Sequence, residues 1–345
     1  MKKLLSIVAA AAMAFSLAAC GMDSGTASEG STAAEGSASQ AEVGETVAPT
    51  GQRMTMGTGG TSGTYYAFGG VLGQYIKNKA GIDITVVATD GSKSNIQGID
   101  AGDYQLGTVQ SDVIAYAWDG TKAFENDGPV QNFRVIGGLY AETVQLVTLN
   151  PDIKTAADLK GKSVSIGAPG SGVYFNAIDV LNAAGLTEDD IKPQYLSFAD
   201  SAEGLKDGKI DAAFIVAGAP TPAITEIATS NDVTLVPIDG EMADAILADC
   251  PYYTTLTIPA GTYPGQDEDV ETITIKATLI VSADADEDTV YNITKAIYDN
   301  ADSIAAEHSK GAELTIENAT SGMTAPFHSG AAKYFEEQGV TVETE

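Results

Sequence analysis

The chain has 345 residues and a formal net charge of −29 at pH 7, with two cysteines and two histidines. Such an acidic surface repels nucleic acid and anionic lipid head groups, so neither is expected as a partner. A small anionic ligand is not excluded, because charges more than about 8 Å away are screened at physiological salt and a pocket acts locally.

The first residues indicate export. Lys2 and Lys3 precede an apolar run over 4–18, which is short for a membrane span and typical of a secretory signal peptide. The run ends Leu-Ala-Ala-Cys-Gly, which resembles the lipobox of bacterial lipoproteins. We therefore expect a signal peptide over 1–19 and a lipid on Cys20. An ordinary signal peptide with a chance cysteine is the alternative.

The segment 20–52 is predicted to be a flexible tether. It is rich in Gly, Ser, Ala, Thr and Glu and contains almost no large apolar residue, so it cannot bury enough surface to offset its ordering entropy. If Cys20 carries a lipid, Cys250 has no partner for a disulfide within the chain. Roughly 290 residues follow the tether, a length that favours two lobes.

A Gly-rich loop begins the folded body. The stretch 54–76 predicts a short strand, a loop of Gly, Ser and Thr, and a helix that starts near Ser62 to Tyr65. The unpaired N–H groups at such a helix start, together with the glycines, favour an anion. The loop matches neither a P-loop, nor the dinucleotide fingerprint, nor a nucleophile elbow. A turn that only caps the helix is the alternative. The side chains expected on the buried face of this helix are Tyr65, Phe68, Leu72, Tyr75 and Ile76.

The order strand, helix, strand, helix, strand occurs twice. In the first copy, 82–89 and 102–111 are strands and a short helix runs through 99–101. The second copy has strands over 162–166, 192–197 and 207–218, a helix over 200–205, and a helix whose apolar residues are Phe175, Ile178 and Leu181. Two βαβαβ units imply an α/β protein with two mainly parallel sheets and helices on both faces.

Ligands in such sheets bind beyond the carboxyl ends of the strands. Six loops qualify, three in each repeat, so that Thr64 and Ser171 approach a ligand from opposite sides if the lobes face each other. A site in one lobe only is the alternative. The loops lie around Thr64, Ser92, Gln110, Ser171, Ser197 and Ala217. The candidate ligand-binding residues are Gly60, Thr61, Ser62, Gly63, Thr64, Tyr65, Ser92, Gln110, Ser171, Gly172, Tyr174 and Ala217.

Two extended stretches, 130–150 and 252–281, are interpreted as crossings between the lobes. The first contains two β-rich runs, and the second contains turns that follow Ile258. We therefore expect lobe 1 over 53–142 plus 272–345 and lobe 2 over 143–271.

Several segments together resemble the TAXI family, the solute receptors of TRAP transporters. They are 57–68, the Asp-Leu-Lys-Gly-Lys motif at 158–162, 167–172, 210–220, 258–263 and 325–334. One departure is Ser329, where the family pattern has Pro. The resemblance implies a type II periplasmic-binding-protein fold, with two lobes joined by two crossing segments around a cleft. It also implies a lipid-anchored extracytoplasmic receptor that delivers a small anionic solute to an ion-gradient-driven TRAP permease. Family ligands include glutamate, 2-oxoglutarate and related dicarboxylates.

Catalysis is the rival class of function. His308 and His328 follow no strand of either repeat, and the acidic run at 284–288 lacks the turn glycine of a calcium loop. We therefore expect no catalytic residue, no metal and no cofactor. A two-lobed secreted α/β enzyme, or a sensor-type binding protein for a small neutral or anionic metabolite, is the alternative.

Overall fold

The computed structural model describes residues 46–345. The predicted signal peptide, Cys20 and most of the predicted tether lie outside the described residues. Over 46–345, no helix is both long and apolar enough to cross a membrane.

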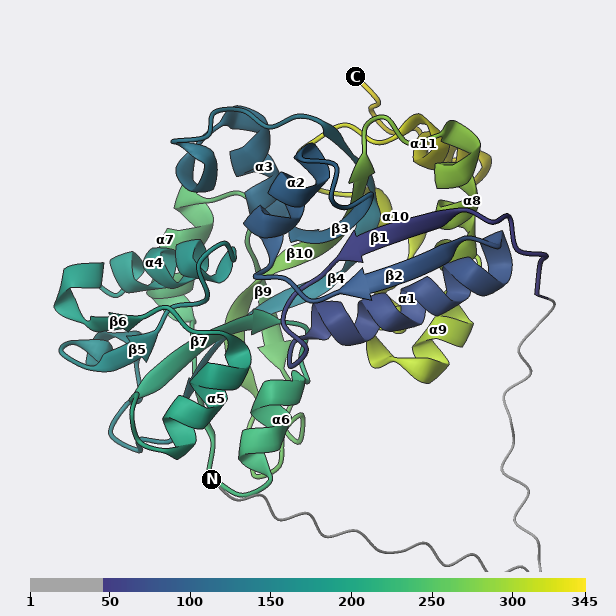
Figure 1. The fold of residues 1–345 in the computed structure, drawn as a ribbon. Coiled ribbons are helices and arrows are strands. Elements are labelled where there is room, and N and C mark those ends of the chain that lie inside the picture. Colours follow the sequence, from purple (N-terminus) through teal and green to yellow (C-terminus); the bar gives the residue numbers. More distant parts are fainter. Residues whose placement is uncertain (1–45) are drawn as a thin grey trace, which may run out of the picture. The chain divides into compact units, whose positions relative to one another are not determined.

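The strands form one mixed sheet (Figure 1). They are β1 (Arg53–Gly57), β2 (Asp83–Val87), β3 (Leu106–Gln110), β4 (Phe133–Thr148), β5 (Ser163–Ser165), β6 (Lys192–Gln194), β7 (Ala212–Ala217), β8 (Thr234–Val236), β9 (Thr254–Ile258) and β10 (Val270–Ser282). Their order in the sheet is β2-β1-β3-β10-β4-β7-β5-β6, with β8 paired to β4 and β9 paired to β10.

Helices connect and cover these strands. They are α1 (Thr64–Ala80), α2 (Ser92–Asp100), α3 (Ser111–Asp119), α4 (Val173–Ala183), α5 (Phe198–Lys206), α6 (Pro222–Ala228), α7 (Gly240–Asp249), α8 (Glu287–Tyr298), α9 (Ala301–Glu307), α10 (Ile316–Thr320) and α11 (Ser329–Glu337). Short 3₁₀ turns lie at η1 (Lys122–Phe124), η2 (Ala156–Leu159), η3 (Glu188–Asp190) and η4 (Ser309–Glu313).

The two predicted βαβαβ units are present. In the first, β1 pairs in parallel with β2 and β3, and in the second, β5 pairs in parallel with β6 and β7. The third strand of each unit starts later than predicted, because Gly102 and Gly208 adopt positive φ angles of 82° and 67° and complete a turn first.

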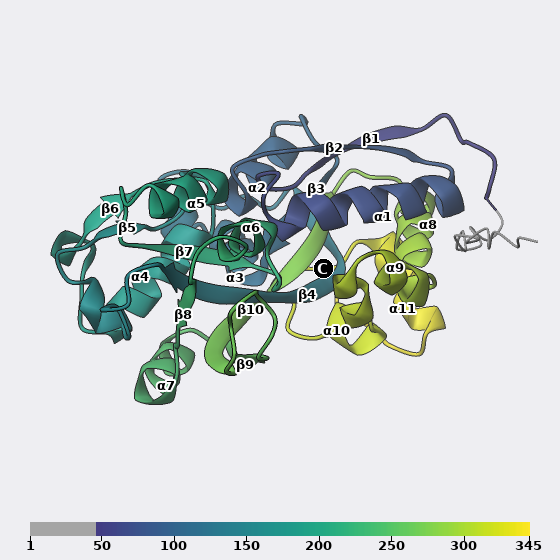
Figure 2. The same cartoon turned by 90° about the horizontal axis from the view of Figure 1, so that it is seen from below.

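The prediction of two separate sheets is wrong, because β4 and β10 join the parallel units into one. These strands have 16 and 13 residues and pair antiparallel with each other. β10 also pairs with β3, and β4 pairs with β7. β4 is continuous where two shorter runs were predicted, because β10 pairs along it, with Ala277 opposite Tyr140. Figure 2 shows β4 passing from one group of helices to the other.

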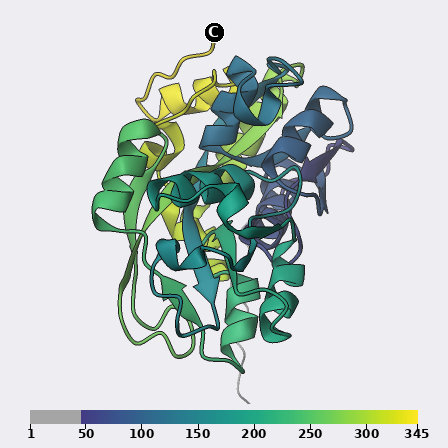
Figure 3. The same cartoon turned by 90° about the vertical axis from the view of Figure 1, so that its left-hand side faces the viewer.

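Separate hydrophobic cores define two lobes. One core is formed by residues from 54–140 and 277–335, including Phe68 and Phe133. Two other core clusters lie within 144–275 and include Phe214 and Ile224. The teal and green helices of this second lobe lie nearest the viewer in Figure 3. β4 and β10 are the segments that contribute to the cores of both lobes.

The helices α1 and α4 occupy equivalent places in the two units and begin at the interface between the lobes. α1 begins at Thr64, as predicted, and buries Phe68, Leu72 and Ile76. α4 is rotated relative to the prediction, because Phe175 and Ile178 are only partly buried. Phe175 turns instead toward the first lobe, where its ring lies 5.7 Å from that of Tyr116.

Candidate ligand-binding site

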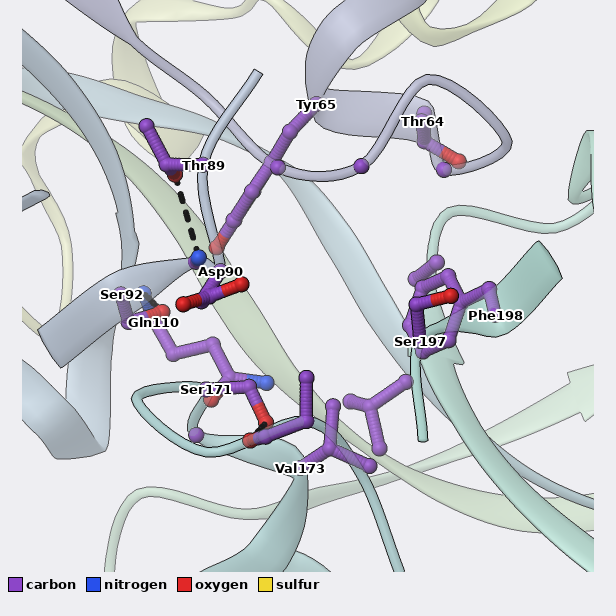
Figure 4. Close-up of a pocket in the computed structure, with 18 of the residues that line it drawn as sticks. Thr64, Tyr65, Thr89, Asp90, Ser92, Gln110, Ser171, Val173, Ser197 and Phe198 are labelled. Carbon is purple, nitrogen blue, oxygen red and sulfur yellow. Dashed lines mark hydrogen bonds between the residues drawn. The ribbon is translucent and has the colours of Figure 1, made fainter. Parts of the chain in front are cut away.

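A cavity lies between the lobes where the parallel strands end. It holds about 620 Å³ of space free of protein atoms, measured out to its mouth. Figure 4 shows Thr64 and Tyr65 on one side of this space and Ser171 and Val173 on the opposite side. Gln110 approaches the cavity from a third direction.

Most of the candidate residues meet at this cavity. Those that line it are Gly60, Gly63, Thr64, Tyr65, Ser92, Gln110, Ser171, Gly172 and Ala217. Both lobes contribute, since residues of the α1, α2 and β3 region face residues of the α4 and β7 region across it.

Three candidate residues lie outside the cavity wall. Thr61 is exposed, and the Ser62 carbonyl accepts a hydrogen bond from the Ala223 N–H. The Tyr174 side chain is a correction to the predicted set, because its hydroxyl donates to Glu188 at 2.7 Å. The reason is the rotation of α4, which places Val173 rather than its neighbour on the cavity wall.

Several wall residues were absent from the predicted set. They are Gly59, Thr89, Asp90, Gly91, Glu142, Ala168, Val173, Leu196, Ser197, Phe198 and Val216. Ser197 belongs to one of the six loops expected to face a ligand. One feature of the sequence could have indicated Glu142 as a site residue: it is the only charged residue between Arg134 and Asn150. That feature went unused because the segment was interpreted only as a crossing.

The starts of α1 and α4 present backbone N–H groups at the cavity. No side chain caps either helix, whose N-cap residues are Gly63 and Gly172. The first N–H groups of a helix have no partner within it and carry the positive end of the helix dipole. An anion bound there would satisfy them.

The Thr64 and Ser171 hydroxyls, in contrast, already have acceptors. Thr64 Oγ1 donates to the Gly218 carbonyl at 2.8 Å, and Ser171 Oγ donates to the Ala168 carbonyl at 2.7 Å. Each hydroxyl has one hydrogen to donate. The expectation that both donate to a ligand therefore does not hold in this arrangement, and the two side chains position the Gly-rich loops instead.

Three polar side chains form one wall of the cavity. The Tyr65 hydroxyl and Gln110 Oε1 are buried and have no hydrogen-bond partner among the described residues. Glu142 is 2 % exposed, and burial raises the pKa of its carboxyl to about 8, although nearby Gln110 and Tyr65 favour the charged form. Burial also raises the pKa of the Tyr65 hydroxyl, which therefore remains a neutral donor.

Buried hydrogen bonds tie the lobes together beside the cavity. Gln110 Nε2 donates to Asn176 Oδ1 at 3.1 Å, and Asn176 Nδ2 donates to Asp112 Oδ2 at 3.0 Å. Burial raises the pKa of Asp112 to about 7. The N–H groups of Lys93 and Ser94 donate to the Gly170 carbonyl across the same interface. These bonds define a closed arrangement of the lobes.

Among residues 46–345, no three His, Cys, Asp or Glu side chains converge in a group that could hold a metal ion. The His328 imidazole caps α11 through Nδ1 and contacts the Ala285 carbonyl through Nε2 at 3.0 Å. A second cavity lies beside β4 and β10 and is lined in part by Lys276 and Asn318. The Lys276 ammonium there donates to the Asn318 and Ser321 carbonyls.

Two α/β lobes, connected by long antiparallel strands around an interlobe cavity, constitute the type II periplasmic-binding-protein fold. A solved structure from Bordetella bronchiseptica RB50 is similar, with a TM-score of 0.51, 17% identity and coverage of 82% of this chain and 88% of that one. The chain belongs to the NMT1-like family, whose sequence profile matches residues 56–339.

Other similarities are more distant or shorter. The structure of the periplasmic aliphatic sulphonate binding protein SsuA from Escherichia coli gives a TM-score of 0.44 at 18% identity, over 83% of this chain and 85% of that one. A curated protein of Escherichia coli K12, named "Putative aliphatic sulfonates-binding protein", is 42% identical over 69 residues. That match spans 20% of this chain and only 21% of the relative.

Proposed function

We propose that the chain is an extracytoplasmic solute-binding receptor that captures a small anionic solute between its lobes. The observation that carries the proposal is a cavity at which two uncapped helix starts, of α1 and α4, meet buried polar groups without partners. An anionic group at the helix starts would satisfy N–H groups that the protein itself leaves unpaired.

The ligand class follows from the polarity of this site. A carboxylate has two oxygens that accept several hydrogen bonds and suits two converging helix starts. Glutamate, 2-oxoglutarate and other small dicarboxylates, the ligands of the resembling TAXI family, are the first candidates. A sulfonate group offers the same charge, and the names of the sulfonate-binding relatives justify its inclusion in the test.

The membrane partner in this proposal is a TRAP-type permease, and a lipid on Cys20 holds the receptor at the outer face of the cell membrane. The segments that resemble TAXI receptors support this assignment. Ligand uptake by cells that contain the receptor and its permease should then stop when an ionophore dissipates the ion gradient. Uptake that persists without the gradient and depends on ATP would contradict the TRAP assignment. Cys20→Ser should release the receptor from the membrane fraction.

The receptor is proposed to release its ligand unchanged. The two carboxyl groups at the cavity, of Asp90 and Glu142, are accompanied there by no histidine and no cysteine among the described wall residues. Incubation with a bound ligand for hours, followed by NMR, should show no new species. A product signal would indicate an enzyme.

A thermal-shift screen of the full chain tests the proposal directly. The panel contains amino acids, keto acids, dicarboxylates, sulfonates, sugars and cations. A ligand present at a hundredfold excess over its Kd stabilises the folded state by about 2.7 kcal/mol. An anionic compound should raise the melting temperature. If only sugars or cations raise it, the anion site is wrong.

A further inference from the structure

The charged side chains at the cavity wall are acidic, whereas a ligand with two anionic groups would be favoured by cationic ones. Two carboxyl groups, of Asp90 and Glu142, belong to its wall, and no Lys, Arg or His is among the described wall residues. The nearby Lys310 ammonium pairs with Glu313 at 2.7 Å. Beyond the two helix starts, the described wall residues therefore offer no cation that would neutralise a further anionic group.

Glu142 forms no ion pair with a Lys, Arg or His side chain of the described residues; the neighbouring Lys310 pairs with Glu313. Glu142 lies on β4 opposite the apolar Ile275 of β10, and its side chain belongs to the cavity wall. Gln110, Tyr65 and the Lys310 ammonium favour the charged carboxylate, and burial outweighs all three of them. A buried carboxyl without a cationic partner is costly to keep and is commonly found at functional sites.

We propose that the Glu142 carboxylate binds the protonated amine of the ligand, so that the cavity selects zwitterionic amino acids over the corresponding keto acids. This inference rests on the proposed solute-binding function and specifies the class of solute. The ligand carboxylate lies at the starts of α1 and α4, and the ligand ammonium lies against the polar wall. Gln110 Oε1, which lacks a partner among the described residues, is a further acceptor for that ammonium.

A keto acid or a simple dicarboxylate meets the same wall without a positive charge. Its carbonyl or second carboxylate would face the oxygens of Glu142 and of Gln110, which repel it unless Glu142 is protonated. An amino acid replaces that repulsion with a charge-assisted hydrogen bond. Such a bond changes affinity roughly ten- to hundredfold.

The first test is calorimetry on the full chain with matched ligand pairs, L-glutamate with 2-oxoglutarate and L-alanine with pyruvate. The wild type should bind at least one amino acid about tenfold or more tightly than its keto acid. Glu142→Gln keeps the shape of the side chain but removes the charge. It should lower amino-acid affinity by a similar factor and leave keto-acid affinity equal or higher.

Glu271→Gln is the matched control. Glu271 is an exposed residue on β10 whose carboxylate accepts a hydrogen bond from Thr257, and it does not belong to the cavity wall. This variant loses the same formal charge, so it should retain the wild-type preference for amino acids. A change equal to that in Glu142→Gln would assign the effect to the overall charge and overturn the proposal.

The second test uses the wild type alone and remains decisive if Glu142→Gln does not fold. Because burial holds the carboxyl mostly protonated at neutral pH, an incoming ammonium should displace a proton. Amino-acid affinity should rise from about pH 6 to about pH 8, and keto-acid affinity should fall. The charged or titratable groups near Glu142 are Tyr65, Tyr140, Asp112, Lys310 and, in the cavity wall, Asp90. Both ligands would meet these same protein groups. Opposite pH dependences of amino-acid and keto-acid affinity would therefore be due to the amine of the amino acid.

The outcomes separate the two proposals. If the keto acids bind as tightly as the amino acids, or if no proton is released with an amino acid, the role of Glu142 is overturned while the receptor function stands. If no carboxylate or sulfonate binds at all, the receptor function itself fails, and the inference fails with it.

Discussion

Gly172 offers the sharpest mutational test of the cavity. It precedes α4 with a φ of −77°, a conformation open to any L-residue, so an alanine brings no backbone strain. Its added Cβ, however, would lie 1.5 Å from Gln110 Oε1 and 2.8 Å from Val113 Cγ2. No real contact is that short. In Gly172→Ala the Gln110 side chain must therefore move away from the start of α4.

The cost follows from the bonds that Gln110 makes. Its Nε2 donates to Asn176 Oδ1 at 3.1 Å, and both residues are buried. Displacement breaks this bond between the lobes and leaves a buried acceptor unpaired, which costs about 1 to 3 kcal/mol. Because the bond belongs to the closed arrangement, the loss should appear as a Kd raised roughly five- to hundredfold. Gly172→Val should bind more weakly still.

The assay is isothermal titration calorimetry with the tightest ligand from the screen, together with melting temperatures without ligand. Gly70→Ala is the control, because a Cβ there meets no atom within 4 Å and the residue is an exposed position of α1. It should bind normally and gain about 0.5 to 1 kcal/mol of stability. Wild-type affinity in Gly172→Ala would refute the reasoning.

Three further predictions concern the hydrogen bond between Thr64 and Gly218, closure of the lobes, and the dependence of stability on pH. Thr64→Val removes the hydrogen bond to the Gly218 carbonyl between the lobes, so calorimetry should show a Kd raised by up to about tenfold. An unchanged Kd would show that this bond does not stabilise the closed arrangement. X-ray scattering should show a smaller radius of gyration with a tight ligand, and an unchanged radius would count against hinge closure. Burial raises the pKa of Glu142 from 4.5 to about 8, so its contribution to stability is present below pH 4.5 and lost as pH rises toward 8. Urea unfolding of the ligand-free protein should show the free energy of unfolding fall by on the order of 4 kcal/mol over this pH range. In Glu142→Gln the free energy of unfolding should depend less on pH. The same pH dependence in both proteins would contradict a raised pKa of Glu142.

The sequence predicted those features that depend on local chemistry. The repeated strand and helix pattern gave both βαβαβ units, and the glycines before Thr64 gave the start of α1. Nine of the twelve candidate residues line the cavity, because loops at the carboxyl ends of parallel strands converge in this fold.

The features that were missed depend on contacts between distant segments. β4 continues through Tyr140 because β10 pairs along it, and local β propensity does not contain that partner. The Thr64 hydroxyl donates to the Gly218 carbonyl, a residue 154 positions away. Tyr174 turns from the cavity because packing sets the rotation of α4. Glu142 could not be assigned to the site from the sequence, because its place in the cavity wall depends on where β4 lies in the folded protein.

A crystal structure of the complex with the tightest-binding acid from the screen tests the central claim most directly. The account predicts ligand density between Tyr65 and Gly172, with a carboxylate or sulfonate within hydrogen-bonding distance of the backbone N–H groups at the starts of α1 and α4. Density instead in the second cavity, beside Lys276 and Asn318, with the interlobe cavity occupied only by water, would contradict it.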